Sequence, residues 1–447
     1  MKIKGGKYKL TGTYTVPGDK SISHRSVMLG ALAEGTTSVS GFLTGEDCLA
    51  TIACFQMLGV DIQQSGTQLT IQGGNLTSPK STLDVGNSGT TLRLIAGILA
   101  GQAFDCMLTG DESIQKRPMK RVVDPLTQMG ADISGIYAPI TIKGRKLKGI
   151  EYTLPIASAQ IKSAILLAGL FADGETIINE PVRSRDHTEI MLAYLDADIR
   201  RKDERVIYRP SKSGIKLKAQ DITVPGDVSS AAFLMVAATI LPGSDIVIEN
   251  VGVNPTRTGI INVLRRMGAD IKLLNERSVC GEKVANIAIR HSLLRATEIS
   301  GSEIPTLIDE IPIIAVAALF AEGETVIKNA EELRVKETDR IQAVVEEFSK
   351  FNFNFLSNGQ KPILTPCPDG MVIKGGHVEY PIVENMDNKP QSIVANSRGD
   401  HRLAMSLAIL ALGLGNGFET TIKNSKCVDI SFPGFYQLLP CDTMVQE

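Results

Sequence analysis

Several features that define other classes of protein are missing from this 447-residue sequence. It has no excess of basic residues, because 47 Lys and Arg face 49 Asp and Glu. A nucleic-acid surface would need such an excess, so nucleic acid is not expected as a partner. The seven cysteines have no CxxC spacing and the five histidines are scattered. This pattern predicts reduced thiols and no metal site.

Long hydrophobic runs are also missing. The first twenty residues contain no apolar core of signal-peptide length, and later apolar runs such as 231–241 are too short to span a bilayer. These absences predict a cytoplasmic protein without a membrane partner. The length exceeds what one hydrophobic core usually serves, which predicts two domains.

What the sequence does contain is one unit repeated six times. Each copy has an apolar helix-like run, a glycine-containing turn and a strand rich in Thr, Val and Ile. The turn glycines are Gly35, Gly101, Gly174, Gly243, Gly323 and Gly417. Three copies continue with an amphipathic helix that ends in MLGVDI (57–62), QMGADI (128–133) or RMGADI (266–271), where a left-handed Gly ends the helix and Asp-Ile begins a strand. The predicted fold class is therefore α/β or α+β.

The phrase TVPGD occurs twice, at 15–19 and at 223–227. It brackets the first three repeats, so we predict one lobe over 17–225 and a second lobe made of 1–16 and 226–447, with three repeats in each. Two chain crossings between lobes, near 15–19 and 223–227, predict hinges and a cleft.

Basic residues follow the predicted starts of several apolar helices. They are Lys20, His24, Arg25, Arg93, Lys162 and Arg402. A helix N-terminus already favours negative charge, so cations placed there predict that anions bind between them. The fourth repeat, TVPGDVSS, has no base at this place and is predicted to be scaffold. His24 and His401 each adjoin an arginine, which disfavours the charged imidazole and leaves a structural role as plausible as a proton shuttle.

The fifth repeat has acidic residues where the others have bases. Asp309 and Glu310 precede its apolar run, and a carboxylate among cations is a candidate general base. The alternative is an ordinary acidic helix cap.

Two further basic clusters lie elsewhere. Residues 110–121, GDESIQKRPMKR, are predicted to form a loop because Pro118 breaks a helix. Residues 332–348, ELRVKETDRIQAVVEEF, are predicted to form one helix with Lys336 and Arg340 on the same face. Each cluster could equally be a solvated surface.

Seven phrases in order, PGDKSISHR, GNSGTTLR, GDESIQKRPM, ASAQIKSA, NPTRTG, RVKETDR and GDHRLAM, closely resemble the 5-enolpyruvylshikimate-3-phosphate (EPSP) synthase family. The resemblance implies the two-lobed enolpyruvyl transferase fold, an inside-out, barrel-like arrangement of six βαβαββ units. It implies transfer of the enolpyruvyl group of phosphoenolpyruvate to the 5-hydroxyl of shikimate 3-phosphate, by addition and elimination through a tetrahedral intermediate, with release of inorganic phosphate. Neither a metal nor an organic cofactor is implied, and a monomer is expected. Glyphosate mimics phosphoenolpyruvate in this family.

Matching motifs assign the site residues residue by residue. For shikimate 3-phosphate they are Lys20, Ser21, Arg25, Ser158, Ala159, Gln160, Ser184 with neighbouring Arg185, Asp309 and Lys336. For phosphoenolpyruvate they are Lys20, Gly89, Arg117, Gln160, Arg340, Arg402 and Lys426. The catalytic residues would be Asp309 as base, Glu337 as proton partner of the methylene carbon, and Lys20, with the division of roles among the three left open.

Three departures from relatives are local. Ser158-Ala159 replaces two serines, His187 replaces a tyrosine, and the stretch 352–398 is longer than expected and is predicted to be a surface excursion. Two alternatives remain: UDP-N-acetylglucosamine enolpyruvyl transferase, which places a reactive cysteine in the loop that here has none, and a non-catalytic ligand-binding relative.

Overall fold

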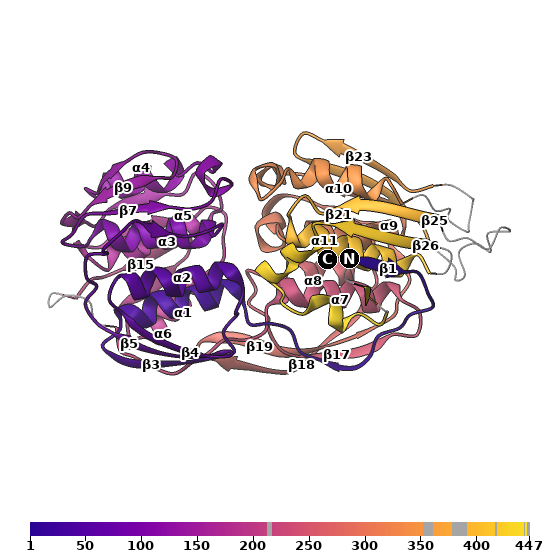
Figure 1. Ribbon diagram of the computed structural model, residues 1–447, viewed down its shortest axis with the longest axis horizontal. Helices are drawn as coiled ribbons and strands as arrows, with labels where there is room; N and C mark the ends of the chain where they lie inside the picture. Colours follow the sequence, from indigo (N-terminus) through magenta and orange to yellow (C-terminus); the bar gives the residue numbers. More distant parts are fainter. Residues whose placement is uncertain (212–216, 352–360, 378–390, 416–417, 442, 445–447) are drawn as a thin grey trace. The chain divides into compact units, whose positions relative to one another are not determined.

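The computed structural model describes residues 1–211, 217–351, 361–377, 391–415, 418–441 and 443–444 (Figure 1). The chain forms two compact units. The terminal unit contains both chain ends and consists of 1–16, 226–277 and 284–447; the inserted unit consists of 17–225 and 278–283. The chain passes between units at Val16–Pro17 and at Pro225–Gly226, which are inside the two TVPGD phrases.

The inserted unit has three four-stranded sheets with the same topology: one parallel pair followed by two antiparallel pairings. In spatial order they are β16 (Ile222–Thr223), β3 (Gly35–Ser40), β5 (Gln68–Gly73) and β4 (Asp61–Ser65); β6 (Leu83–Asp84), β7 (Cys106–Thr109), β9 (Ile140–Lys143) and β8 (Asp132–Ser134); and β11 (Glu151–Thr153), β13 (Thr176–Asn179), β15 (Arg205–Tyr208) and β14 (Ile199–Lys202). A short parallel pair joins β10 (Leu147–Lys148) to β12 (Ala172–Asp173).

The terminal unit repeats this topology three times. Its sheets are β2 (Thr11–Tyr14), β17 (Asp245–Gly252), β19 (Glu282–Arg290) and β18 (Asp270–Val279); β21 (Glu298–Ile299) and β20 (Leu294–Arg295) beside β22 (Ala321–Ile327), then β24 (Gly370–Gly375) and β23 (Ile363–Cys367); and β25 (Gln391–Asn396), β26 (Phe418–Lys423), β1 (Lys2–Lys4) and β27 (Thr443–Met444). The sixfold repeat predicted from the sequence is confirmed.

Each TVPGD phrase follows a strand that belongs to the other unit's sheet. β2 precedes the first apolar helix along the chain but pairs with β17, whereas β16 precedes the fourth apolar helix but pairs with β3. The two repeats therefore exchange their first strands, and this exchange makes all six sheets equivalent.

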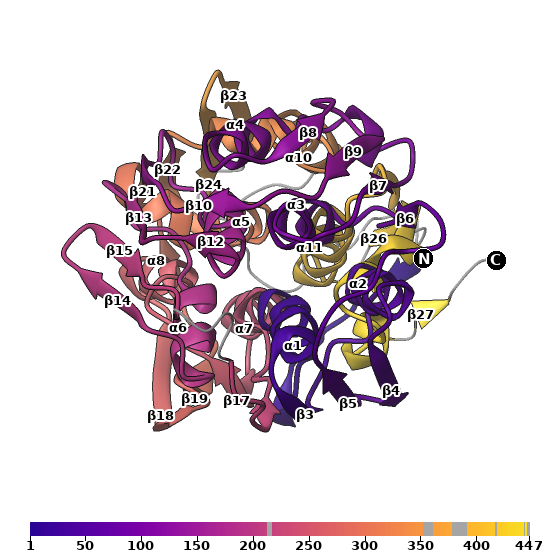
Figure 2. The same cartoon turned by 90° about the vertical axis from the view of Figure 1, so that its left-hand side faces the viewer.

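Apolar helices form the centre of the inserted unit. Figure 2 shows α1, α3 and α5 end-on with the unit's strands around them. The helices of this unit are α1 (Lys20–Leu32), α2 (Glu46–Met57), α3 (Gly89–Ala100), α4 (Lys120–Gln128), α5 (Ala159–Gly169), α6 (His187–Tyr194) and the short 3-10 helix η1 (Ile114–Lys116). The first helices of the three repeats are buried along most of their length, and polar residues of α1 such as Ser23, His24 and Arg25 are buried together with the apolar ones.

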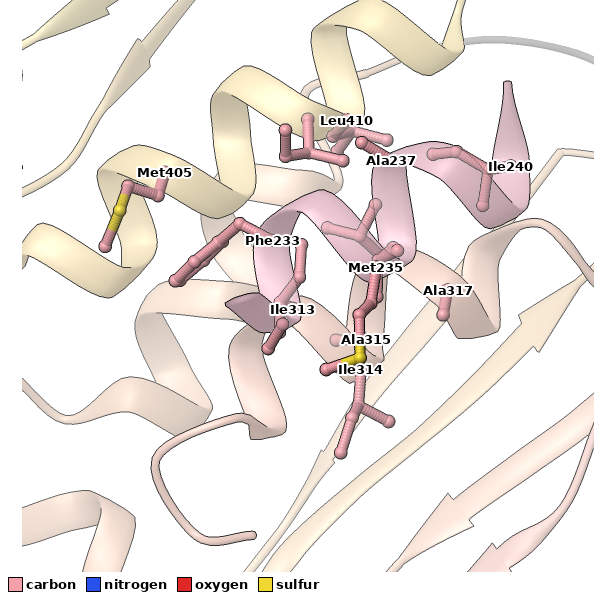
Figure 3. Close-up of a cluster of buried hydrophobic side chains, with 14 of the residues drawn as sticks. Phe233, Met235, Ala237, Ile240, Ile313, Ile314, Ala315, Ala317, Met405 and Leu410 are labelled. Carbon is pink, nitrogen blue, oxygen red and sulfur yellow. The ribbon is translucent and has the colours of Figure 1, made fainter. Parts of the chain in front are cut away.

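The terminal unit is built in the same way. Its helices are α7 (Val228–Ile240), α8 (Gly259–Arg266), α9 (Ile311–Leu319), α10 (Arg340–Phe348), α11 (His401–Gly413) and the 3-10 helices η2 (Gly301–Thr306), η3 (Glu331–Val335), η4 (Ser425–Ile430) and η5 (Phe435–Leu438). Every residue of α7, α9 and α11 is buried. Figure 3 shows their side chains in contact, with Phe233 and Met235 between Met405 and Ile314. Helices that are buried on every side are expected at the centre of a core.

The repeated phrases MLGVDI, QMGADI and RMGADI have the predicted conformation. Gly59, Gly130 and Gly268 have φ of 88°, 99° and 101°, and β4, β8 and β18 begin two residues later. Any residue with a Cβ is disfavoured at such φ values, so glycine ends these three helices for a conformational reason.

Three predictions of local structure are wrong. Residues 110–121 are not a simple loop, because η1 lies within them and α4 begins at Lys120. Residues 332–348 form η3 and α10 rather than one helix; Asp339 accepts a hydrogen bond from the Gln342 N–H and starts a new helix, while Lys336 is extended. The stretch 361–377 is no surface excursion, since β24 belongs to a sheet and buries Met371 and Ile373. The predicted excursion also covered residues 352–360 and 378–390, which lie outside the described residues.

All seven cysteines lie within the described residues and none forms a disulfide. Across the described part of the chain, no helix combines the length and apolar character needed to cross a membrane.

Candidate active site

The first helices of the inserted unit begin with capped ends that lie close together. Asp19 caps α1 by accepting from the Ile22 N–H at 2.9 Å, and Ser88 caps α3 by accepting from the Thr91 N–H at 3.1 Å. The hydroxyls of Thr51 and Thr91 lie 2.7 Å apart and join α2 to α3. The helix ends that the sequence predicted as anion sites are thus neighbours within this unit.

Lys20 is the first residue of α1, and its ammonium forms an ion pair with Asp47 in the first turn of α2. The side chain remains partly exposed at 19%. Lys20 is therefore held beside the helix ends but still accessible.

A second group of side chains joins α3 to α5. Arg93 donates to Gln160 Oε1 at 3.1 Å, and Gln160 Nε2 donates to Thr90 at 3.3 Å. A Cβ at Gly89 would lie 2.7 Å from Arg93 Nη1 and 3.4 Å from Arg117 Nη1. Three predicted site residues, Gly89, Arg117 and Gln160, therefore lie together, and the absence of a side chain at Gly89 makes room for two guanidinium groups.

Arg25, in the second turn of α1, is held by neutral groups. Its Nε donates to Thr188 at 2.7 Å, Nη2 donates to Ser163 at 2.7 Å, and Nη1 donates to the Ser21 carbonyl at 2.9 Å. Burial lowers the pKa of Arg25 to about 10, so the guanidinium is still charged near neutral pH. Ser158, for its part, caps α5 through the Ile161 N–H at 3.4 Å, which places Ala159 in the first turn.

Lys162 does not fit its predicted role as an accessible cation. Its side chain is fully buried and pairs with Glu180 at 2.8 Å and Glu189 at 2.7 Å. Two carboxylates satisfy the buried ammonium, so the interpretation of Lys162 as an anion-binding group is wrong. Ser184 is tied into the same network, since both its N–H and its hydroxyl donate to Glu180.

In the terminal unit, Arg340 lies at the centre of a carboxylate cluster. Its guanidinium donates to Asp400 at 2.7 Å, to Glu337 at 2.7 Å and to Asp309 at 3.3 Å. Lys336 Nζ lies 3.5 Å from the same Asp309 oxygen. Four predicted site residues thus meet here: Asp309, Lys336, Glu337 and Arg340.

Charge pairing controls the ionisation of this cluster. Burial alone would lower the pKa of Arg340, but Asp400, Glu337 and Asp309 together raise it. Burial would likewise raise the pKa of Asp400, yet Arg340 brings it below the usual value. The cluster therefore consists of mutually stabilised charges.

Arg402 and Lys426 differ in their contacts within the terminal unit. Asp400 caps α11 by accepting from the Arg402 N–H at 2.9 Å, which places Arg402 in the first turn, and Arg402 Nη1 lies 3.6 Å from Glu310 Oε1. Lys426 is exposed on η4, a segment that packs against α11. No hydrogen bond or ion pair within the described residues joins Lys426 to the others.

The TVPGDVSS segment that starts the fourth repeat contains no basic residue, but a cation from later in the same repeat lies beside it. Arg257, from the phrase NPTRTG, donates to Asp227 at 3.0 Å and to Ser229 at 2.7 Å. Asp227 also caps α7 through the Ser229 N–H. Position along the chain gave no signal for this pairing, although NPTRTG was one of the seven phrases.

Two buried histidines have different partners. Burial lowers the pKa of His24 to about 3, and its Nδ1 lies 2.7 Å from Thr51 Oγ1. A buried imidazole with a lowered pKa stays neutral near pH 7, which favours the structural role for His24. His187 Nδ1 lies 2.6 Å from Glu282, the first residue of β19, in the segment 278–283 that belongs to the inserted unit; sequence reasoning missed this pair.

Each unit therefore contains a polar cluster at the starts of its apolar helices. The cluster of the inserted unit contains hydroxyls, an amide, cations and the Asp47 carboxylate, while that of the terminal unit contains several carboxylates and cations. Within the described residues, no group of three His, Cys, Asp or Glu side chains is arranged to hold a metal ion. This chemistry suits small anions and proton transfer.

The fold is that of the enolpyruvyl transferases. The structure of the enolpyruvyl transferase NikO from Streptomyces tendae matches with a TM-score of 0.75 and covers 98% of this chain and 96% of that one, at 16% identity. An EPSP synthase structure from Acinetobacter baumannii matches more closely, with a TM-score of 0.84 and 44% identity over 98% of this chain and 96% of that one.

The sequence comparisons narrow the class to one family. The model of EPSP synthase (3-phosphoshikimate 1-carboxyvinyltransferase) matches residues 4–439. A protein named 3-phosphoshikimate 1-carboxyvinyltransferase from Brevibacillus brevis is 52% identical over 446 residues, which are 98% of this chain and 99% of the relative. One from Citrifermentans bemidjiense is 50% identical over 435 residues, 96% of each. The chain belongs to the EPSP synthase family, and the resemblance drawn from the seven phrases is confirmed.

Proposed function

We propose that this protein transfers the enolpyruvyl group of phosphoenolpyruvate to the 5-hydroxyl of shikimate 3-phosphate and releases inorganic phosphate. Family membership over nearly the whole chain supports this reaction. The observation that carries the proposal is the cluster in which Arg340 contacts both Asp309 and Glu337, with Lys336 beside Asp309. Two carboxylates among cations can serve a reaction that moves protons on anionic substrates.

The proposed reaction adds and then eliminates. Asp309 accepts the proton of the 5-hydroxyl while the 5-oxygen of shikimate 3-phosphate bonds to C2 of phosphoenolpyruvate. Glu337 donates a proton to the C3 methylene, which becomes a methyl group. The tetrahedral intermediate then returns a methyl proton to the Glu337 carboxylate and loses its phosphate, which restores the double bond. The cations stabilise the phosphate and carboxylate groups throughout.

The binding roles assigned from the family motifs are part of this proposal. The hydrogen bonds of Arg25 all go to neutral groups, which leaves its positive charge suited to the acceptor's carboxylate. Ser184 donates its hydroxyl to Glu180, so a role in binding phosphate would require that hydroxyl to rotate. The proposed binding of phosphoenolpyruvate still includes Lys20, Gly89, Arg117 and Arg402.

Phosphate release tests the reaction directly. Protein supplied with phosphoenolpyruvate and shikimate 3-phosphate should release phosphate in steady state, and replacing the acceptor with UDP-N-acetylglucosamine should abolish release. Turnover only with the nucleotide sugar would favour the related transferase. Binding of both substrates without turnover would favour a non-catalytic relative.

We also propose that the protein acts as a cytoplasmic monomer and that the chain crossings at 15–19 and 223–227 are hinges. Light scattering after size-exclusion chromatography should give the mass of one chain. Small-angle scattering should show compaction when shikimate 3-phosphate and a donor analogue are added together, and an unchanged profile would contradict the hinges.

A further inference from the structure

Glu310 is a fully buried carboxylate that no step of the proposed reaction uses. It precedes α9 in the N-cap position but makes no capping hydrogen bond, and Pro312 in the first turn has no N–H to offer. The cap alternative weighed for this pair of acidic residues is therefore wrong for Glu310. Burying an uncompensated carboxylate is costly, so its partners should explain why it is there.

The partners of Glu310 come from three other segments of the terminal unit. The Ser229 hydroxyl, in the first turn of α7, donates to Glu310 Oε1. Arg402 Nη1, in the first turn of α11, lies 3.6 Å from the same oxygen. Arg257 completes the group, since it donates to Ser229 at 2.7 Å and to Asp227 at 3.0 Å.

The charges of this group balance. Asp227 and Glu310 are negative, whereas Arg257 and Arg402 are positive, and all four side chains are buried. Arg257 and Asp227 already form a pair at the start of α7. Glu310 in turn pairs with Arg402. Ser229 links the Arg257–Asp227 pair to the Arg402–Glu310 pair, because it contacts both Arg257 and Glu310.

We propose that Glu310 is a positioning residue that orients the Arg402 guanidinium for binding of phosphoenolpyruvate. The inference rests on the proposed function, in which Arg402 binds the donor. Glu310 is fully buried and so acts through Arg402. An arginine side chain has several rotatable bonds. If Glu310 holds the Arg402 guanidinium in one orientation before the anion binds, part of the entropy cost of binding is removed.

This role predicts an effect confined to one substrate. Glu310→Gln keeps an oxygen that can accept from Ser229 but removes the charge opposite Arg402. We expect the KM for phosphoenolpyruvate to rise roughly tenfold, a size typical of residues that orient a ligand-binding group. The KM for shikimate 3-phosphate and the melting temperature should stay near wild-type values.

A second variant covers the case in which Glu310→Gln does not fold. Ser229→Ala keeps the carboxylate but frees its Oε1, and the donor KM alone should rise about fivefold, since loss of one hydrogen bond is worth on the order of 1 kcal/mol. The matched control is Asp245→Asn, which breaks an exposed ion pair with Arg290 in the same unit and should leave both KM values unchanged.

The outcomes separate the inference from the proposed function. Wild-type phosphate release with a selective rise in donor KM supports Glu310 as a positioning residue. A donor KM that is unchanged or lower, or two KM values that rise together with a lower melting temperature, overturns it. If the wild type does not turn over the substrate pair, equilibrium dialysis with phosphoenolpyruvate decides: weaker binding by Glu310→Gln and by Arg402→Lys alike supports the inference, and wild-type binding by Glu310→Gln overturns it.

Discussion

Two buried arginines, one in each unit, have opposite surroundings. Arg25 is held by two hydroxyls and a carbonyl, and burial lowers its pKa to about 10. Arg340 meets three carboxylates, which raise its pKa despite burial. A guanidinium held by neutral groups is ready to pair with an anionic ligand, whereas one held by carboxylates orders those carboxylates for proton transfer. The comparison supports the proposal that Arg25 of the inserted unit holds the acceptor and that the terminal unit carries the proton-transferring carboxylates.

The strongest test of this comparison removes a carboxylate beside Arg340. Asp309→Asn keeps the shape of the side chain but cannot accept a proton, so kcat should fall by about 10² to 10⁴, the range for loss of a general base. Phosphate release measures the loss, while shikimate 3-phosphate binding and the melting temperature should be retained. A wild-type rate would remove Asp309 from the base role.

A smaller effect is expected at the other arginine. Arg25→Lys keeps the charge but loses the planar fork that Thr188 and Ser163 hold, so the KM for shikimate 3-phosphate should rise by roughly 10- to 100-fold, equivalent to about 1.4–2.8 kcal/mol. The donor KM should change little. Arg200→Lys, at an exposed pair in the same unit, is the control, and equal rises in both KM values would contradict a binding role confined to the acceptor.

Gly89 tests whether space between cations matters as much as their charge. In Gly89→Ala the new methyl group would meet Arg93 Nη1 at 2.7 Å, the far end of a flexible side chain that can move. We expect a donor KM about tenfold higher, equivalent to roughly 1.4 kcal/mol and in the range for mild overpacking, and little loss of stability. Inhibition by glyphosate, expected for the wild type, should weaken in parallel; an unaltered donor KM would show that Arg93 and Arg117 need no such space.

The last test measures stability rather than activity and concerns His24, the neighbour of Arg25. Because the folded-state pKa of His24 is about 3, below its ordinary value of 6.5, the unfolded chain binds this proton more readily. The contribution to stability is complete above pH 6.5 and is lost as pH falls toward 3. Urea unfolding between pH 7 and pH 4 should show it, and His24→Gln should reduce the slope by up to about 1.4 kcal/mol per pH unit. An identical slope in the variant would mean that His24 is charged in the folded protein.

Much of the fold could be predicted because the structure of each repeat depends mainly on residues close together in the sequence. Apolar runs fixed the central helices, and Gly59, Gly130 and Gly268 fixed where amphipathic helices end. Predictions failed where a capping residue set the start of a helix or where a strand paired with a partner distant in sequence. Asp339 divided one expected helix into two, and pairing of β24 with β22 placed an expected surface excursion in a sheet.

The candidate site could be predicted as a set of residues but not as a set of contacts. Lys20, Arg25 and Arg402 were identified from their positions at helix starts. Lys162 satisfied the same pattern, yet Glu180 and Glu189 bury and neutralise it. A pattern of charge along the chain cannot tell an accessible cation from a compensated one, because the compensating groups are distant in sequence.

The two TVPGD phrases show the same division. The sequence by itself determined that both would form a turn, a capping Asp and a buried helix, since cap chemistry and apolar runs act over a few residues. Only the tertiary structure decided that β2 and β16 exchange sheets, and that Arg257, from later in the fourth repeat, supplies the cation missing from the start of that repeat. Strand pairing and the compensation of buried charge depend on segments far apart in the chain, which local sequence does not specify.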